Sequence, residues 1–186
     1  MISIKTKYLI LFVLAFSYTI SANAQTFVGK NIKVNIFSST PVEDIKAASS
    51  SGAAVLIAQK QELAVQVNIK SLEFDKKLMQ EHFNENYMES DKYPTAKFKG
   101  VISPKIDWTT DGEYNVNAKG TLSVHGVDQA RNITGKLAIR NGVVSLYSNF
   151  DVVCAAHQIK IPSLVFTKIA EVIKVTIQGT LNPLNK

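Results

Sequence analysis

The sequence contains a single cysteine, Cys154, among its 186 residues. An intramolecular disulfide is therefore excluded, and the fold depends on the burial of apolar side chains. A chain of this length folds by default as one domain that buries roughly 70% of its unfolded surface, so no covalent cross-link is required. Cys154 shares strand parity with Phe150 and Val152, which predicts a buried thiol rather than a reactive one.

The motifs of common catalytic and metal sites are also missing. The sequence has no G-x-S-x-G, no P-loop, no H-E-x-x-H and no G-x-G-x-x-G at a strand–helix junction. Its three histidines, His82, His125 and His157, lack the spacing of metal ligands. His125 precedes a turn glycine, which favours a structural hydrogen bond for its ring. We therefore expect a protein that is not an enzyme and has no metal site.

A concentrated charge of one sign is absent as well. The net charge is +6 and the pI is about 9.3, but the basic residues are spread along the chain without a basic run interleaved with aromatic residues. This pattern argues against nucleic-acid binding. A mild positive excess suits a soluble surface that tolerates contact with anionic membranes.

The chain has one pronounced apolar run, at its N-terminus. Lys5 and Lys7 precede the apolar stretch Tyr8–Phe16, and an A-x-A pattern ends at Ala24. This order is typical of a secretory signal peptide. A retained membrane anchor is the alternative, but the run is shorter than the roughly 20 residues that span a bilayer.

Cleavage near Ala24 divides the chain into a signal peptide, residues 1–24, and a mature domain, residues 25–186. We therefore expect the mature protein to be periplasmic or secreted. No cysteine follows the cleavage site, so a lipid anchor at that point is not expected.

Alternating apolar and polar residues predict β-strands over most of the mature domain. In the clearest case, Tyr114–Val127, the residues Val116, Ala118 and Leu122 fall on one face and polar residues fall on the other. Gly120 lies inside this strand, where glycine marks a bend or a close approach of another segment. In chain order, the predicted strands are Asn31–Phe37, Ala53–Ala58, Leu63–Lys70, Lys97–Ile102, Tyr114–Val127, Ile133–Arg140, Val144–Cys154 and Ile173–Gly179.

Turn signals separate the predicted strands. Asp111-Gly112 and Asn141-Gly142 predict tight hairpin turns. A threonine followed by proline predicts a short helical turn over Pro41–Ala47. We expect Ser49–Gly52 to form a loop and His125–Arg131 to form a longer connection.

One helix is predicted in the mature domain, over Asp75–Tyr87. Met79, Phe83 and Tyr87 recur at the spacing of one helix face, and Asp75 is expected to cap the N-terminus. This face either packs on the sheet as an ordinary helix or closes one end of it.

The eight predicted strands, joined mostly by hairpins, indicate an all-β fold with one helix, in which an antiparallel sheet closes into a barrel because free edges are a liability. The interior of an eight-stranded barrel fits either its own side chains or one small ligand, and alternation does not distinguish the two. The candidate ligand-binding residues come from the inner strand face and the helix: Ile36, Val65, Val67, Ile69, Met79, His82, Phe83, Tyr87, Met88, Phe98, Val116, Leu122, Val124, Ile139, Phe150, Val175 and Ile177.

Two groups of residues together carry a family resemblance that extends from about Phe27 to Leu181. They are Leu78, His82-Phe83, Tyr87, Lys92-Tyr93-Pro94, Ala96 and Phe98, followed by Gly120, Leu122 and His125-Gly126-Val127. In this combination and spacing the chain resembles the YceI-like family of secreted lipid-binding proteins. The resemblance implies a lipocalin-like barrel of about eight antiparallel strands, with helical cover near one end and a polyisoprenoid chain in the lumen.

The chain departs from this family near its C-terminus. Many relatives carry an Arg-x-Asp-Phe-Gly type segment there, whereas this chain reads Cys154-Ala155-Ala156-His157-Gln158-Ile159. This difference marks a divergent branch of the family.

The main hypothesis is therefore a non-catalytic carrier or buffer for an isoprenoid-like chain. We expect no cofactor, and the resemblance implies a polyisoprenoid or an isoprenoid quinone as the candidate bound ligand. His82 is the candidate hydrogen-bond partner of a quinone-like head group, and the expected partners are an apolar lipid and a membrane surface. One alternative is a solid barrel that binds a protein partner. The other is an enzyme acting on an apolar substrate, which requires polar groups that converge inside the lumen.

Overall fold

The computed structural model describes residues 25–161 and 169–184, and the predicted signal peptide lies outside these ranges. No helix in the described part of the chain is long and apolar enough to cross a membrane. In chain order, the elements are β1 (Thr26–Ser39), β2 (Asp44–Ile57), η1 (Ala58–Lys60), β3 (Glu62–Asn68), η2 (Ile69–Ser71), β4 (Glu73–Phe74), α2 (Lys77–His82), η3 (Phe83–Tyr87), β5 (Thr95–Ser103), β6 (Gly112–Val124), β7 (Val127–Arg140), β8 (Val143–Val153), η4 (Cys154–His157) and β9 (Val172–Pro183).

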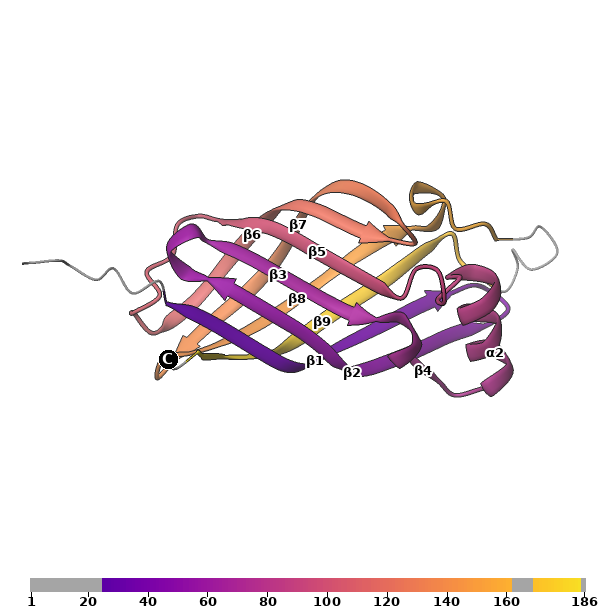
Figure 1. The fold of residues 1–186 in the computed structure, drawn as a ribbon, viewed down its shortest axis with the longest axis horizontal. Coiled ribbons are helices and arrows are strands. Elements are labelled where there is room, and N and C mark those ends of the chain that lie inside the picture. The colour runs from indigo at the N-terminus through magenta and orange to yellow at the C-terminus, as the bar shows by residue number, and fades with distance from the viewer. Residues whose placement is uncertain (1–24, 162–168, 185–186) are drawn as a thin grey trace, which may run out of the picture.

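Eight of these strands close into an antiparallel barrel. The strand order is β1-β9-β8-β7-β6-β5-β3-β2, and β2 pairs back onto β1. The two-residue strand β4 adds to β2 outside this circle. The barrel is elongated, with α2 at one end and the C-terminus at the other (Figure 1). The predicted all-β fold with one helix and a closed antiparallel barrel is confirmed.

The strand β2 is much longer than the sequence pattern predicted. The helical turn expected over Pro41–Ala47 is wrong, because the chain makes a tight turn there and β2 begins at Asp44. The loop expected over Ser49–Gly52 is also wrong, because this segment lies within β2: Ser49 and Gly52 pair with Val34 and Ile32 of β1, and the pairing shifts register between them. In both places main-chain hydrogen bonds to a long neighbouring strand override the turn preference of the local residues.

The connection between β6 and β7 is shorter than predicted. Only two residues link the strands, His125 and Gly126, and both have positive φ angles, 51° and 72°. β7 therefore begins at Val127, and the longer connection expected up to Arg131 is wrong. The Asn141-Gly142 turn between β7 and β8 is confirmed, with φ angles of 51° and 73° that suit these two residue types.

The predicted helix is present but short. α2 covers Lys77–His82, and the chain continues as one π-helical turn over Phe83–Tyr87. The cap expected at Asp75 is wrong, because Lys76 occupies the N-cap position and no side chain caps the helix. Without a cap, this segment depends on its packing against the barrel end.

The barrel end opposite α2 is filled by side chains. Phe27, Leu56 and Leu181 are at most 1% exposed there, and the Trp108 ring packs on Phe27 with 6.1 Å between ring centroids. The Gln61 amide satisfies buried main-chain groups: its Nε2 donates to the carbonyl oxygen of Ile106, and its Oε1 accepts from the Ile106 N–H. We call this region the packed end.

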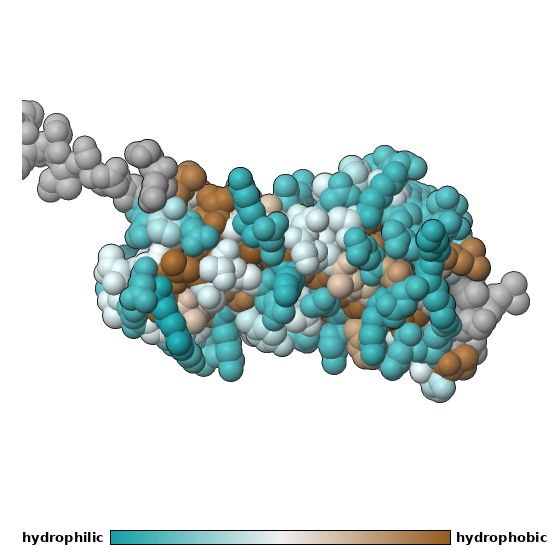
Figure 2. Space-filling model, turned by 90° about the horizontal axis from the view of Figure 1, so that it is seen from below, coloured by the Kyte–Doolittle hydropathy of each residue, from teal (hydrophilic) through white to brown (hydrophobic). Residues whose placement is uncertain are grey.

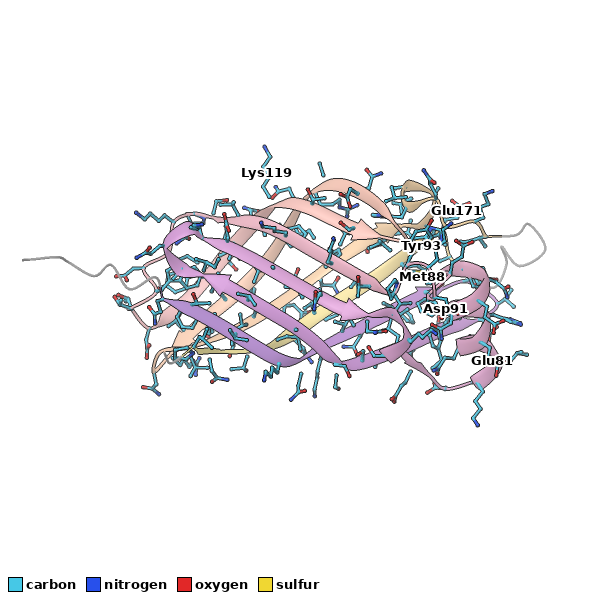
Figure 3. All side chains as sticks on the ribbon, in the orientation of Figure 1. Glu81, Met88, Asp91, Tyr93, Lys119 and Glu171 are labelled. Atoms are coloured by element: carbon cyan, nitrogen blue, oxygen red, sulfur yellow. The ribbon has the colours of Figure 1, made fainter. Side chains whose placement is uncertain are left out.

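The outer face of the barrel is mainly polar. The face seen from below is largely hydrophilic, with apolar side chains showing between polar ones and at the end that carries α2 (Figure 2). Lys119, which follows the buried residue Ala118 in β6, points away from the wall (Figure 3). The alternation seen in the sequence thus separates the lumen from the solvent.

Candidate functional site

The half of the barrel nearer α2 encloses a cavity of about 550 Å³. This volume lies within the range of roughly 300–1,000 Å³ that is typical of small-molecule sites. All eight barrel strands contribute to its lining, and α2 and η3 lie at its mouth. The lumen is therefore hollow in one half and solid in the other, which the sequence pattern did not distinguish.

All of the candidate ligand-binding residues except Ile139 line this cavity. Ile139 has the expected inward orientation, but it lies in the packed end and is 0% exposed. Its neighbour on the inner face of β7, Leu137, lines the cavity instead. Strand alternation identified which side chains point inward, but it does not give their depth along the lumen.

Several further lining residues were not singled out from the sequence. For most of them, strand alternation already indicates an inward orientation like that of the predicted residues. They are Val34, Leu63, Ile102, Ala118, Ile133, Leu146 and Val152. Others lie in segments without a strand or helix pattern, namely Leu72, Ile159 and Ile161. Only the folded chain brings these residues to the cavity.

The helical cover contributes apolar side chains to the mouth. Met79, Phe83 and Tyr87 are partly buried and Met88 is 6% exposed, and all four line the cavity. The Phe83 ring packs against Phe74 with 4.8 Å between the ring centroids. Burial raises the pKa of the Tyr87 phenol above its usual value. Figure 3 places Met88 at the α2 end of the barrel, and these residues both pack on the barrel and close part of its opening.

Polar side chains line the cavity at this mouth and also along the wall strands, where they are Gln66, Lys97, Thr134, Lys136 and Ser148. Lys76 Nζ lies 2.8 Å from Glu43 Oε1, and this ion pair links the start of α2 to the β1–β2 hairpin. The hydrogen bond to Glu43 raises the pKa of the Lys76 ammonium. His82 also lines the mouth and is exposed to solvent. Among the described residues, no cluster of three or more His, Cys, Asp or Glu side chains is placed to hold a metal ion.

The other two histidines have structural roles. His125 Nδ1 donates to the carbonyl oxygen of His157 over 3.1 Å, which confirms the hydrogen bond predicted for His125. His157 is 0% exposed, and its Nδ1 donates to the carbonyl oxygen of Val127 over 3.1 Å. The Tyr93 ring meets His125 edge-on, with 4.7 Å between ring centroids. Together these contacts fasten η4 to the β6–β7 turn.

The barrel strands β7 and β8 are paired through their main chains over only part of their length. Main-chain pairing runs only from Gly135–Ser148 to Arg140–Val143. Towards α2, side chains bridge the strands instead, as where Ser148 Oγ donates to the Thr134 carbonyl oxygen over 2.7 Å. Gln129 Nε2 similarly donates to the carbonyl oxygen of Ala156 in η4. The segment in which this chain departs from the family pattern therefore covers the less regular part of the cavity wall.

Cys154 lies in the cavity lining and is buried, as predicted. Burial raises the pKa of its thiol from 9.0 to about 11. At pH 8 the reactive thiolate is then about 100-fold scarcer than in an ordinary thiol.

We expect iodoacetamide to label Cys154 in the native protein about 100-fold more slowly than in urea-unfolded protein at pH 8. Since Cys154 is the only cysteine, a single rate is measured for each state by mass spectrometry. Native and unfolded rates that agree within about tenfold contradict a buried, proton-retaining thiol.

Solved structures share this architecture at low sequence identity. A polyisoprenoid binding domain from Saccharophagus degradans is 12% identical, with a TM-score of 0.72 over 87% of this chain and 99% of that chain. BcnA from Burkholderia cenocepacia is 14% identical, with a TM-score of 0.67 over 80% of this chain and 95% of that chain. The YCEI protein from Campylobacter jejuni is 15% identical, with a TM-score of 0.59 over 77% of this chain and 87% of that chain.

No curated protein matches the chain. The family model described as YceI-like domain matches residues 16–181, which include all eight barrel strands except the last residues of β9. This match agrees with the closed barrel, the helical cover at one end and the motif residues that carry the resemblance in the sequence. The chain therefore belongs to the YceI-like domain family.

Proposed function

We propose that this protein is a non-catalytic carrier or buffer for a polyisoprenoid or a similar long apolar molecule, held inside the barrel outside the cytoplasm. The observation that carries the proposal is the cavity of about 550 Å³, lined mainly by aliphatic and aromatic side chains and blocked at one end. The similar domain from Saccharophagus degradans, described as polyisoprenoid binding, supports the same class of ligand. The export signal predicted from the N-terminal sequence supports the proposed compartment.

Burial of apolar surface is sufficient to hold such a molecule. Each buried CH₂ group contributes about 0.8 kcal/mol, so roughly 15 carbons gain on the order of 12 kcal/mol. Association costs about 4–15 kcal/mol, which leaves a moderate affinity suited to a carrier that must also release its ligand.

The position of the polar residues favours one orientation of the ligand. The packed end offers no opening, whereas His82, Lys76 and Glu43 stand at the mouth. An apolar tail would enter first and leave a polar head group, such as a quinone ring, beside His82. The ion pair between Lys76 and Glu43 occupies these two groups with each other, which leaves His82 as the mouth group to donate to such a ring.

Lipid extraction tests this proposal directly. The full-length chain is produced in a bacterial host that exports it, purified without detergent, extracted with organic solvent and analysed by mass spectrometry. We expect a co-purifying polyprenyl lipid or isoprenoid quinone near one molecule per barrel. Lipid-free protein that also fails to bind added prenyl alcohols contradicts the proposal.

The α2 end is the side we propose for contact with a membrane. Four of the large apolar side chains that are most exposed lie at this end: Val42 and Leu78 at 62% and 63%, with Val153 and Val172 at 39% and 45%. Figure 2 shows apolar side chains at this end, as it does near the opposite end. They surround the mouth, so contact with a bilayer would bring the cavity opening to the lipid source.

Replacing Val42 with Glu is expected to slow delivery of a fluorescent prenyl probe to anionic vesicles by about tenfold, because a charge replaces an apolar contact worth on the order of 1–2 kcal/mol. Val42 does not line the cavity, so the equilibrium affinity for the same probe in solution should stay unchanged. The matched control is Val101→Glu, which changes another exposed valine, at 51%, on the side wall. Equal delivery rates for both variants and the unmodified protein exclude the α2 end as the docking side.

A further inference from the structure

The cavity stops partway along a barrel whose strands continue beyond it. Its floor includes Val34, Leu137 and Leu146. Inward-facing strand residues two apart lie one above the other along the lumen, so the next layer beneath this floor contains Ile32, Ile139 and Val144. These three side chains are 0% exposed, as is Leu181 of β9. We call the four residues Ile32, Ile139, Val144 and Leu181 the stopper.

A β-bulge brings Ile32 into this layer. Between Lys30 and Ile32 the strand β1 advances two residues while β2 advances only one, from Ala53 to Gly52. Asn31, the extra residue, has a φ angle of 62°. Such a bulge reverses the alternation, so that Phe27 and Ile32, which differ in parity, are both fully buried inside the same barrel.

Glycines on three strands make room for the Ile32 side chain. A Cβ atom on Gly29 would lie 2.7 Å from Ile32 Cδ1, and one on Gly179 would lie 2.5 Å from the same atom. A Cβ on Gly52 would lie 2.6 Å from the Ile32 carbonyl oxygen. Since real Cβ atoms do not approach this closely, the Ile32 side chain packs directly on the main chain at Gly29 and Gly179, and the Ile32 main chain packs directly on Gly52.

We propose that the stopper sets the longest apolar chain that the cavity accepts, with Ile32 as its principal residue. This inference rests on the proposed function, since it concerns the ligand of the same cavity. A layer of inward-facing residues is about 7 Å deep, which is on the order of one to two isoprene units. Truncating a stopper side chain should therefore lengthen the preferred ligand by up to that amount, and raising the floor should shorten it.

The experiment measures binding of a series of all-trans prenyl alcohols, from three to ten isoprene units, to the full-length protein by quenching of a fluorescent competitor. For the unmodified protein, we expect the affinity to rise with chain length up to a limit and then to stay constant. In Ile32→Ala this limit should move to longer alcohols. The affinity for alcohols just longer than the original limit should rise about tenfold, because roughly two more CH₂ groups are buried. Ile32→Val should move the limit in the same direction by less.

A second variant tests the opposite direction without removing any buried contact. Ile177 lines the cavity and pairs with Val34 at the floor, so Ile177→Phe extends a ring into open space. The limit should then move to shorter alcohols. The matched control is Ile106→Ala, which removes the same atoms as Ile32→Ala from a residue that is 4% exposed in the loop after β5. Ile106 lies beyond the barrel strand, so this variant should bind the series as the unmodified protein does.

The possible outcomes distinguish failure of the length-limit inference from failure of the proposed function. If the unmodified protein binds prenyl alcohols but Ile32→Ala and Ile177→Phe keep its length limit, the stopper does not select length and the carrier function stands. If Ile106→Ala moves the limit as far as Ile32→Ala does, the shift reflects general loosening and the inference is wrong. If no alcohol of any length binds the unmodified protein, the proposed function fails and the length limit fails with it.

Discussion

Replacing Ala118 with Phe is expected to lower the affinity for a long apolar chain by about 100-fold or more. Ala118 lies in the middle of β6, lines the cavity and is 6% exposed. A phenyl ring at this position extends across the lumen between the mouth and the floor. Excluding roughly four CH₂ groups of the ligand loses about 3 kcal/mol, which corresponds to the expected change in affinity.

The measurement is a titration with a fluorescent prenyl probe, combined with lipid analysis of the purified variant. Because the ring enters existing space, the free energy of unfolding should not fall. Lys119→Phe is the matched control, since it adds the same ring one residue further along the strand, on the side that points away from the barrel (Figure 3). Unchanged affinity in folded Ala118→Phe protein means that the ligand does not occupy this lumen.

Replacing Gly120 with Ala is expected to lower the free energy of unfolding by about 3 kcal/mol or more, at the upper end of overpacking effects. An added Cβ would lie 2.1 Å from the Lys99 carbonyl oxygen and 2.4 Å from the Gly100 Cα atom. Both obstacles belong to the main chain of β5, which pairs with β6 at Gly100–Gly120. The strands must separate at this point, which weakens the ladder and the curvature of the closed wall.

Urea unfolding followed by circular dichroism measures this change. Gly112→Ala in the same strand is the control, because its Cβ would meet only the end of the Tyr114 side chain, 3.2 Å from Oη. That variant should change the free energy of unfolding by less than about 1 kcal/mol, since a flexible side chain can move and the unfolded state loses entropy. Equal stabilities of the two variants contradict the close approach of β5 and β6 at Gly120.

The close approach at Gly120 was among the features that could be predicted from sequence. A glycine that interrupts an apolar strand face has few explanations, and the structure confirms one of them. The burial of Cys154 and the structural hydrogen bond of His125 were predictable for a similar reason. Each depends on strand parity or on an adjacent turn glycine, which are local properties of the chain.

The errors arose where a distant strand determined the local conformation. Ser49–Gly52 has the composition of a loop, but it lies within β2, where Ser49 and Gly52 pair with Val34 and Ile32 of β1. Asp75 is a good capping residue by type, yet the helix begins later and packs on the barrel without a cap. Propensities of about 1 kcal/mol or less per residue do not prevail over a continuous ladder or a packed interface.

The closed eight-stranded barrel, its inward-facing residues and the family could all be predicted from the amino-acid sequence, because alternation and turn residues act within a few positions of each other. The place where the lumen is hollow became known only from the folded chain. The bulge at Asn31 and the glycines on β1, β2 and β9 admit Ile32 at one depth and leave open space above it. Depth along the lumen depends on the register among all eight strands, which no single stretch of sequence encodes.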